Sequence, residues 1–409
     1  MNIYKNMPGK SQLLNLAFPQ AERELAEVNA HLHTPYSFSA FESVQKALDM
    51  AVAEKISVVG INDFNTTDGF ERWAEECLIR NLFPLFNIEF IALNREDQTK
   101  GIRVNDPGNP GRTYLSGKGL AYPQVIKGKS LDKLNSIRSE SNRHAEKICA
   151  NLNRHLSACD APFRINFKDV IENLTLGNIR ERHLAKALRL EITEFFKNES
   201  DQVAFYKKIF GGNSLKNNIS NVAGVENEIR SNLLKAGGPA FVPENPESFL
   251  DLEDISRIII DAGGIPTYPF LADDAQGKFT DFERDLPEAL EVLKSRGISS
   301  VEFIPSRNTV RVLEKYAEYC FDNGLIVTFG TEHNTPQMEP VKVFASGRTE
   351  LTRRLKEISY RGACVIAAHQ YLVGTGEKGY INEHGMPDVN RCDEYIKLGH
   401  ALIKHVTNK

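Results

Sequence analysis

The stretch ISVVGINDFNTTDGFERWAEECLIRNLFPLFNIEFIA, residues 56–92, decides the fold class of this chain. It opens with the β-branched, apolar run ISVVGIND (56–63) and continues with apolar side chains at helical spacing in TDGFERWAEECLIRN (67–81). It ends with a second apolar run, LFPLFNIEFIA (82–92). A strand, a helix and a strand in this order indicate two parallel strands joined by a crossover helix, so we expect an α/β fold.

The same alternation occurs on both sides of this stretch. AEVNAHLHT (26–34) is typical of a strand, and FESVQKALDMAVAEK (41–55) is typical of an amphipathic helix. Three further apolar runs, each followed by a helical pattern, come late in the chain: IPTYPF (265–270), SSVEFIP (299–305) and LIVTFG (325–330).

The alternation is interrupted between the two series. NDPGNPGRTYLSGKGL (105–120) is rich in Gly, Pro and Asn, which indicates a loop. The polar segments after it have helical spacing. We therefore expect one barrel, with residues 1–95 as its first part and 96–235 as a mostly helical insertion. Residues 236–409 would form the second part of the barrel and the C-terminal helices.

The composition is that of a globular protein. The chain has 409 residues, of which 25% are charged and 41% hydrophobic, and its net charge is −4. Such a balance does not indicate nucleic acid as a partner. The six cysteines contain no C-x-x-C pair, and no apolar run approaches the roughly 20 residues needed to cross a bilayer. We expect a cytoplasmic protein without a membrane partner.

The most suggestive polar residues are two histidines in the first expected strand. His31 and His33 lie two positions apart, and alternation along a strand places both imidazoles on the same face. Neutral imidazoles that converge on one point are good ligands for Zn²⁺, Mn²⁺ or iron. The pair alone is a weak signal and is also compatible with other roles.

Acidic residues and a further histidine follow three other expected strands. Asp63 ends one strand, Glu89 lies near the end of the next, and Glu332 and His333 directly follow LIVTFG. Each has a simpler explanation: a helix cap or turn for Asp63 and Glu332, a salt bridge for Glu89, and a surface loop for His333. In a β/α barrel, however, the strand ends converge, so these residues would become neighbours. We therefore expect a functional site there.

Several segments together resemble the PHP (polymerase and histidinol phosphatase) family. They follow the family order over about residues 25–95 and 245–340. NAHLHTPYS resembles the family's H-x-H-T-x-x-S opening, and VVGINDFNTTDGF resembles its T-D-H segment. NIEF is similar to its G-x-E, VTFGTEH to its late G-S-D-x-H-type motif, and GGIPTYPF to its G-G-x-x-x-A-H-P. IRERHLAKAL (179–188) is similar to a helix of phosphoesterase-like members.

The resemblance implies a distorted (β/α)₇ TIM-like barrel whose metal ions activate water for phosphoester hydrolysis. For this chain it implies one or two divalent ions (Zn, Mn or Fe), or up to three as in the family. It places Glu332 at the position of the family's Asp, and it implies metal ligation by the residues His31, His33, Asp63, Glu89 and His333.

Two positions depart from the family motifs. Phe64 stands where T-D-H has its His, and Tyr268 stands where A-H-P has its His. Phenylalanine cannot bind a metal, and a neutral tyrosine is a poor ligand. The remaining residues still suffice for one or two ions, and Tyr268 would serve as an acid or a hydrogen-bond donor.

Cationic residues are expected to neutralise the oxygens of a phosphate group. The candidates are Arg180, Arg182 and His183 in the insertion and Arg307 after the strand that contains Glu302. The alternative for each arginine is an ordinary solvated position on a helix surface.

Three functions are compatible with these residues. The first is a phosphoesterase that acts on a small phosphorylated metabolite or a nucleotide. The second is a degenerate PHP domain that binds a ligand or partner without catalysis, which Phe64 and Tyr268 favour. The third is hydrolysis of an amide or another ester on a related barrel, because a fold alone does not fix the bond that is cleaved.

Overall fold

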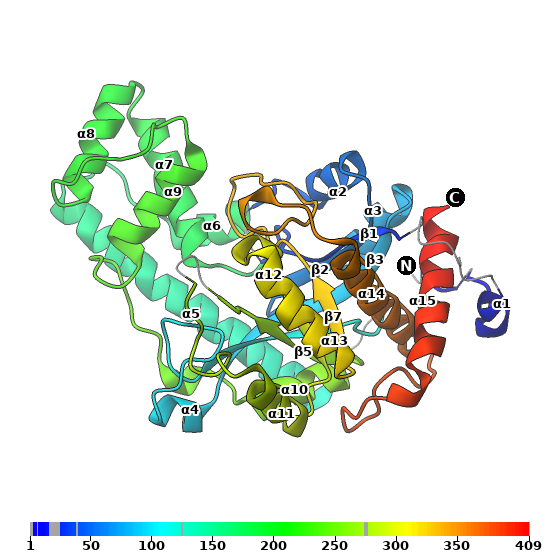
Figure 1. Cartoon of the computed structure of the whole chain (residues 1–409). Coiled ribbons are helices and arrows are strands. Elements are labelled where there is room, and N and C mark those ends of the chain that lie inside the picture. Colours follow the sequence, from blue (N-terminus) through cyan, green and yellow to red (C-terminus); the bar gives the residue numbers. More distant parts are fainter. Residues whose placement is uncertain are drawn as a thin grey trace.

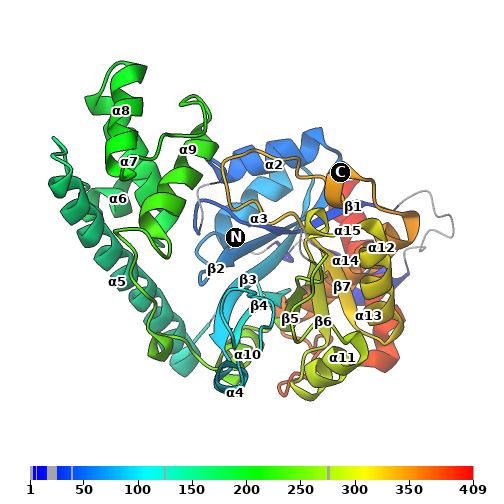
Figure 2. The ribbon, with the colours of Figure 1, turned by 60° about the vertical axis from the view of Figure 1, so that its left-hand side comes forward.

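The centre of the molecule is a seven-stranded sheet, seen in a computed structural model that describes residues 3–5, 7–15, 25–37, 40–123, 126–273 and 277–408. The strands follow one another in chain order across the sheet (Figure 2). Their bounds are β1 Glu27–Leu32, β2 Ile56–Phe64, β3 Phe83–Leu93, β4 Arg112–Lys118, β5 Ile265–Phe270, β6 Ser300–Phe303 and β7 Ile326–Phe329.

All neighbouring strands run parallel except β4, which is antiparallel to both β3 and β5. The two ends of the sheet meet where β1 and β7 finish. Leu32 forms a parallel bridge with Glu332, and the His33 N–H donates to the Glu332 carbonyl at 2.9 Å. The sheet is therefore nearly closed, and the predicted distorted, TIM-like barrel is confirmed.

Helices cover the outer face of the sheet. The helix α2 packs against β2, α3 against β3, α10 against β4 and β5, and α14 against β7 and β1. Polar side chains fix several helix starts: the Ser43 hydroxyl, the Asp285 carboxylate and the Thr352 hydroxyl each accept a backbone N–H of the first turn. The bounds are α2 Val44–Ala53, α3 Phe70–Ile79, α4 Arg95–Thr99, α10 Leu252–Asp261, α11 Leu286–Ser295, α12 Val310–Leu313, α13 Tyr319–Asp322 and α14 Arg353–Gly374.

The chain ends on the side of the barrel opposite the insertion (Figure 1). The last helix, α15 (Cys392–Thr407), packs along α14, and the short α1 (Lys10–Leu14) packs against α15. Small residues allow the close approach of the two long helices: a Cβ at Gly399 would lie 1.8 Å from the Cys364 carbonyl oxygen. One apolar core joins this helix layer to the barrel.

The strand β4 differs from our expectation. Its residues belong to the Gly-rich stretch 105–120, which we expected to be a loop within the insertion. In the structure Arg112–Lys118 pairs with β3 on one side and β5 on the other, so it completes the sheet. Tyr114, Ser116 and Lys118, which carry polar groups, alternate with Leu115 and Gly117, a strand pattern that the surrounding glycines and prolines obscure.

The segment from Gly128 to Leu234, between β4 and β5, forms the mostly helical insertion, which projects from the barrel (Figure 1). It has a separate apolar core built from residues between Ala145 and Ala240. The first half of its longest helix contacts the barrel, since Leu134 belongs to the barrel core. The helices are α5 Gly128–Ala158, α6 Phe167–Leu174, α7 Glu181–Phe195, α8 Glu199–Ile209 and α9 Val222–Ile229.

Two findings concern the environment of the protein. Within the described ranges, no helix is long and apolar enough to cross a bilayer. All six cysteines lie in these ranges and are free thiols.

Candidate metal centre

Three buried side chains meet at the carboxyl ends of β1 and β3. His31 and His33 project from the end of β1, and Glu89 projects from β3. The two Nε2 atoms are 3.4 Å apart; Glu89 Oε2 lies 3.4 Å from His33 Nε2, and Glu89 Oε1 lies 4.0 Å from His31 Nε2. Each residue is at most 4% exposed. The three therefore form a compact, water-poor group.

This group fits a divalent cation. Each residue offers one ligand atom, and the three atoms lie within 4.8 Å of one another. Two nitrogen ligands held at about 2.0–2.1 Å from a tetrahedral zinc ion lie about 3.4 Å apart, which is the separation observed for the imidazoles. Two imidazole nitrogens and a carboxylate oxygen are also the mixture that Zn²⁺, Mn²⁺ and Fe²⁺ accept.

The electrostatics of the group favour a cation in the same place. Burial, and then the neighbouring charge of His31, lower the pKa of His33 well below its usual value, so its imidazole is neutral and able to act as a ligand. Burial, followed by the negative charges of Glu332 and Glu302, raises the pKa of Glu89 well above its usual value. A bound divalent ion would supply the positive charge that the Glu89 carboxylate lacks.

A carboxylate on β6 orients His31. His31 Nδ1 lies 3.1 Å from Glu302 Oε2, an arrangement in which Nδ1–H donates to the carboxylate and Nε2 remains available as a ligand. The amide nitrogen of Asn62 lies 3.1 and 3.0 Å from the two ring nitrogens, against the ring edge between them. With Nδ1 protonated, the Asn62 N–H donates to Nε2, so a metal ion at Nε2 would take the place of this hydrogen bond.

Asp63 holds the backbone that follows the two histidines. Its carboxylate accepts the Thr34 N–H at 2.7 Å, the Thr34 hydroxyl at 2.5 Å and the Ser37 hydroxyl at 2.6 Å. The Ser37 hydroxyl also lies 3.4 Å from His33 Nδ1. Burial raises the pKa of Asp63 to about 7. The structure thus places Asp63 next to the ligand group, as a support for His33.

Glu332 and His333 occupy different places despite being neighbours in the chain. Glu332 forms an ion pair with Arg307, and its charge acts on Glu89, so both lie at the mouth of the site. His333 is turned into the following loop, where Nδ1 lies 2.7 Å from the Thr331 hydroxyl and Nε2 lies 2.8 Å from the Glu339 carbonyl. The structure therefore does not bring His333 to the ligand group.

The insertion residues divide in the same way. Arg182 reaches the mouth: it donates to the Asn334 side chain at 3.4 Å, and its charge contributes to the lowered pKa of His33. Arg180 lies over the Phe64 ring, 4.4 Å from the ring centre. His183 instead caps helix α7, because its Nδ1 accepts the Arg180 N–H at 3.0 Å. Arg182 remains a candidate for substrate binding, whereas the geometry gives His183 a structural position.

Tyr268 lies on the other face of the sheet. In the β5–β6 register Pro269 pairs with Glu302, whose side chain points into the barrel. Tyr268 pairs with Val301, one residue earlier, so its side chain points to the opposite face of the sheet. Its hydroxyl donates to Glu283 Oε1 at 2.7 Å outside the barrel. The structure therefore does not bring Tyr268 to the ligand group, and the expected role of Tyr268 as an acid or hydrogen-bond donor in the site has no support in this geometry.

Two important residues, Glu302 and Lys118, were not candidates in the sequence. Glu302 lies within an apolar strand pattern, the same signal that identified Glu89. Lys118 is hidden because its strand lies in a Gly-rich stretch. The Lys118 ammonium lies 2.6 Å from Glu302 Oε2, and neither side chain is exposed to solvent.

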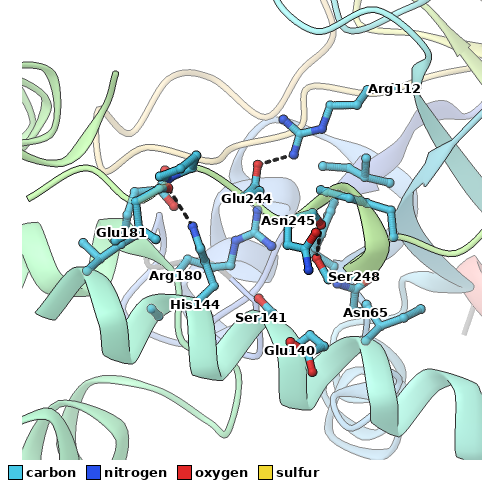
Figure 3. Close-up of a pocket in the computed structure, with 18 of the residues that line it drawn as sticks. Asn65, Arg112, Glu140, Ser141, His144, Arg180, Glu181, Glu244, Asn245 and Ser248 are labelled. Atoms are coloured by element: carbon cyan, nitrogen blue, oxygen red, sulfur yellow. Dashed lines mark hydrogen bonds and ion pairs between the residues drawn. The ribbon is translucent and has the colours of Figure 1, made fainter. Parts of the chain in front are cut away.

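A cleft of about 360 Å³ opens beside the centre, between the barrel and the insertion. Its described lining includes Phe64 and Asn65, directly after Asp63, but not the three ligand residues themselves. Figure 3 shows the α5 side of this cleft and the ion pair between Arg112 and Glu244. Phe64, which lines the cleft, is paired with Glu89 across the neighbouring strands β2 and β3. The cleft therefore lies next to a ligand residue.

Solved structures that resemble this one include the following two. An amidohydrolase from Chromobacterium violaceum, solved with bound sulfate and no metal, is 18% identical, with a TM-score of 0.52 over 81% of this chain and 96% of that chain. A protein described as a metal-dependent phosphoesterase from Bifidobacterium adolescentis is 16% identical, with a TM-score of 0.50 over 82% and 96%.

Comparison of the sequence alone identifies no relative. No protein-family model matches the sequence, and no curated protein matches it. At such low identities the structural similarity establishes the fold. The chain has the barrel that its resemblance to the PHP family implies.

Proposed function

We propose that this chain is a cytoplasmic, metal-dependent hydrolase of the PHP type that cleaves phosphate esters of a small metabolite or a nucleotide. The observation that carries the proposal is the convergence of His31 Nε2, His33 Nε2 and the Glu89 carboxylate within 4.8 Å. These three residues would hold a divalent ion, Zn²⁺, Mn²⁺ or Fe²⁺. When bound, such an ion lowers the pKa of water from about 15.7 towards about 7 and so supplies a nucleophile at neutral pH.

The other residues would orient the ligands and bind the substrate. Glu302 fixes the ring of His31, and Asp63 fixes the turn that carries His33 through Thr34 and Ser37. Without these contacts the imidazoles would sample other rotamers and lose the spacing that a metal needs.

Arg182 and Arg307 would neutralise the phosphoryl oxygens. Arg182 comes from the insertion and Arg307 from the segment after β6, so the two approach the mouth from different parts of the chain. The guanidinium group of Arg307 is half-exposed and paired with Glu332, so an anionic substrate would compete with that carboxylate for it. The remainder of the substrate would extend into the cleft lined by Phe64 and Asn65.

A metal and activity assay tests the proposal. The protein is stripped with a chelator, dialysed against Mn²⁺ or Zn²⁺, and assayed for metal content and for hydrolysis of p-nitrophenyl phosphate. We expect His33→Ala and Glu89→Gln to lower metal affinity strongly, because each removes a ligand. The loss should exceed the factor of about 10 to 100 that is typical when a residue that only orients a ligand is replaced. His384→Ala, at an exposed position, is the control and should leave both readouts unchanged.

The assay also separates the alternatives. A protein that binds metal but hydrolyses neither phosphomonoesters nor dinucleotides would contradict the proposal in favour of a degenerate binding domain. Amide hydrolysis is the second catalytic candidate, since one protein with this fold is an amidohydrolase. Turnover of an amide panel with no turnover of the phosphate panel would establish that activity instead.

A further inference from the structure

Lys118 is a buried cation inside the barrel to which the proposed function assigns no role. It projects from β4, and its side chain is completely inaccessible to solvent. The ammonium lies 2.6 Å from Glu302 Oε2 and 3.3 Å from both the Ala30 carbonyl and the Asn62 side-chain oxygen. An ammonium group is costly to bury, so a lysine in this position requires a firm anionic partner.

Glu302 is that partner, and both of its oxygens are engaged. Oε2 contacts both Lys118 Nζ and His31 Nδ1, while Oε1 accepts the Ser116 hydroxyl at 2.5 Å. The Lys118 ammonium, 2.6 Å from Oε2, supplies the positive charge that favours the ionised form of this buried carboxylate. Glu302 is therefore an ionised carboxylate that is already neutralised by protein.

The remaining buried acids near the centre have similar constraints. Asp63 accepts three hydrogen bonds from Thr34 and Ser37, so it has little capacity left for a metal. Glu332 is paired with Arg307. Glu89 lies against the two imidazoles, 3.4 Å from His33 Nε2 and 4.0 Å from His31 Nε2.

We propose that Lys118 acts as a fixed cation that occupies the Glu302 carboxylate and thereby restricts the centre to one divalent ion. A second ion bound through Glu302 would lie close to the Lys118 ammonium, and the two positive charges would repel each other. This inference rests on the proposed function, because it assumes that His31, His33 and Glu89 bind a metal. In a centre with one ion, Arg182 and Arg307 would have to neutralise the negative charge of the substrate that a second ion would otherwise neutralise.

Metal stoichiometry tests the inference without reference to activity. The full-length protein is stripped with a chelator and dialysed against increasing Mn²⁺, and bound metal per chain is measured by inductively coupled plasma mass spectrometry. We expect the wild-type protein to reach a plateau at one ion per chain. Lys118→His removes the ammonium and adds an imidazole beside Glu302, so we expect its plateau to rise to two ions.

Two further variants make the result decisive. Lys129→His adds a histidine at an exposed position of α5 and should remain at one ion. Lys118→Gln removes the charge but keeps an amide hydrogen bond to Glu302, and we expect it to bind a second ion more weakly than Lys118→His does. Circular dichroism and the melting temperature establish that each variant is folded.

The possible outcomes separate this inference from the proposed function. A wild-type plateau at two or more ions overturns the role of Lys118 but leaves a metal-dependent hydrolase intact. Folded Lys118→His and Lys118→Gln that both stay at one ion also overturn it. A wild-type protein that binds no metal contradicts the proposed function itself.

Discussion

His369 shows how a histidine can be essential to the fold without taking part in the site. It lies within α14 and is almost fully buried; its Nε2–H donates to the Gly263 carbonyl at 2.6 Å, while its Nδ1 accepts the Tyr380 N–H at 2.9 Å. A protonated ring would place a second N–H against that of Tyr380. The folded state therefore requires the neutral imidazole.

We predict that His369 makes the stability of the protein depend on pH. Burial lowers its pKa to about 4, whereas an unfolded histidine has a pKa of about 6.5. The folded state binds fewer protons between these values, so the free energy of unfolding falls as the pH is lowered through this window. From about pH 7.5 to about pH 5 the contribution of this group is about 2 kcal/mol.

Urea unfolding of the wild type and of His369→Gln at both pH values measures this effect. Glutamine can replace both hydrogen bonds but does not titrate, so its loss of stability over the same pH range should be smaller by about 2 kcal/mol. Equal losses in the two proteins would show that His369 is not the group responsible.

The ligand candidates show which residues a sequence reveals. His31, His33 and Glu89 stand in strands with clear patterns, and their convergence follows from strand alternation and barrel geometry. The orientation of His333 could not be predicted, because it depends on a loop that turns the ring towards Thr331. Lys118 could not be identified as an interior residue before its strand was known.

The closure between β7 and β1 is the element on which the metal centre depends most directly. Gly330 follows β7, and a Cβ at this position would lie 2.2 Å from His31 Cβ and 2.7 Å from His31 N. The absence of a side chain therefore lets β7 approach the strand that carries the ligands. We predict that Gly330→Ala separates the two strands and displaces His31.

The expected cost of this substitution is about 1–3 kcal/mol of stability, as for other overpacked interiors. Mn²⁺ affinity should also fall, because His31 Nε2 would move relative to His33. Gly108→Ala is the matched control, since the nearest atom to its Cβ would be 3.6 Å away. Denaturant titration and Mn²⁺ binding provide the two readouts, and unchanged Mn²⁺ affinity in Gly330→Ala would contradict the proposed coupling.

At the level of elements, hydrophobic patterns predicted the six parallel strands but not the antiparallel one. Glycines, prolines and an exposed turn surround Arg112–Lys118, and its pairing with Phe83–Leu93 and Ile265–Phe270 is non-local. Strand preference depends strongly on such tertiary neighbours. The local sequence therefore favoured a loop where the sheet required a strand.

The molecule as a whole consists of a barrel and a helical insertion that is fastened to the barrel mouth. The Asn178 amide donates to the Phe64 carbonyl at 2.8 Å, and Arg138 forms an ion pair with Asp68 at 2.6 Å. The interrupted strand–helix rhythm of the sequence led us to expect a barrel and an insertion. Their contact could not be predicted, since it joins residues far apart in the chain.

This attachment leads to a prediction about substrate binding. Arg182 belongs to the insertion, yet it contacts Asn334 after β7 and acts electrostatically on His33. If the insertion completes the site, Arg182→Ala should lower kcat/KM for a phosphomonoester by about 10- to 100-fold, as expected for one lost hydrogen bond to a charged group. Its Mn²⁺ content should remain unchanged, because Arg182 is not a ligand.

The exposed Arg164 provides the control, as Arg164→Ala removes an insertion arginine at another position. Both variants should retain the wild-type melting temperature within a few degrees, while only Arg182→Ala loses activity. A fall in Mn²⁺ content that parallels the loss of activity would mean that Arg182 supports the metal ligands. Unchanged kinetics would mean that the barrel binds its substrate without the insertion, and the position of Arg182 at the mouth would then require another explanation.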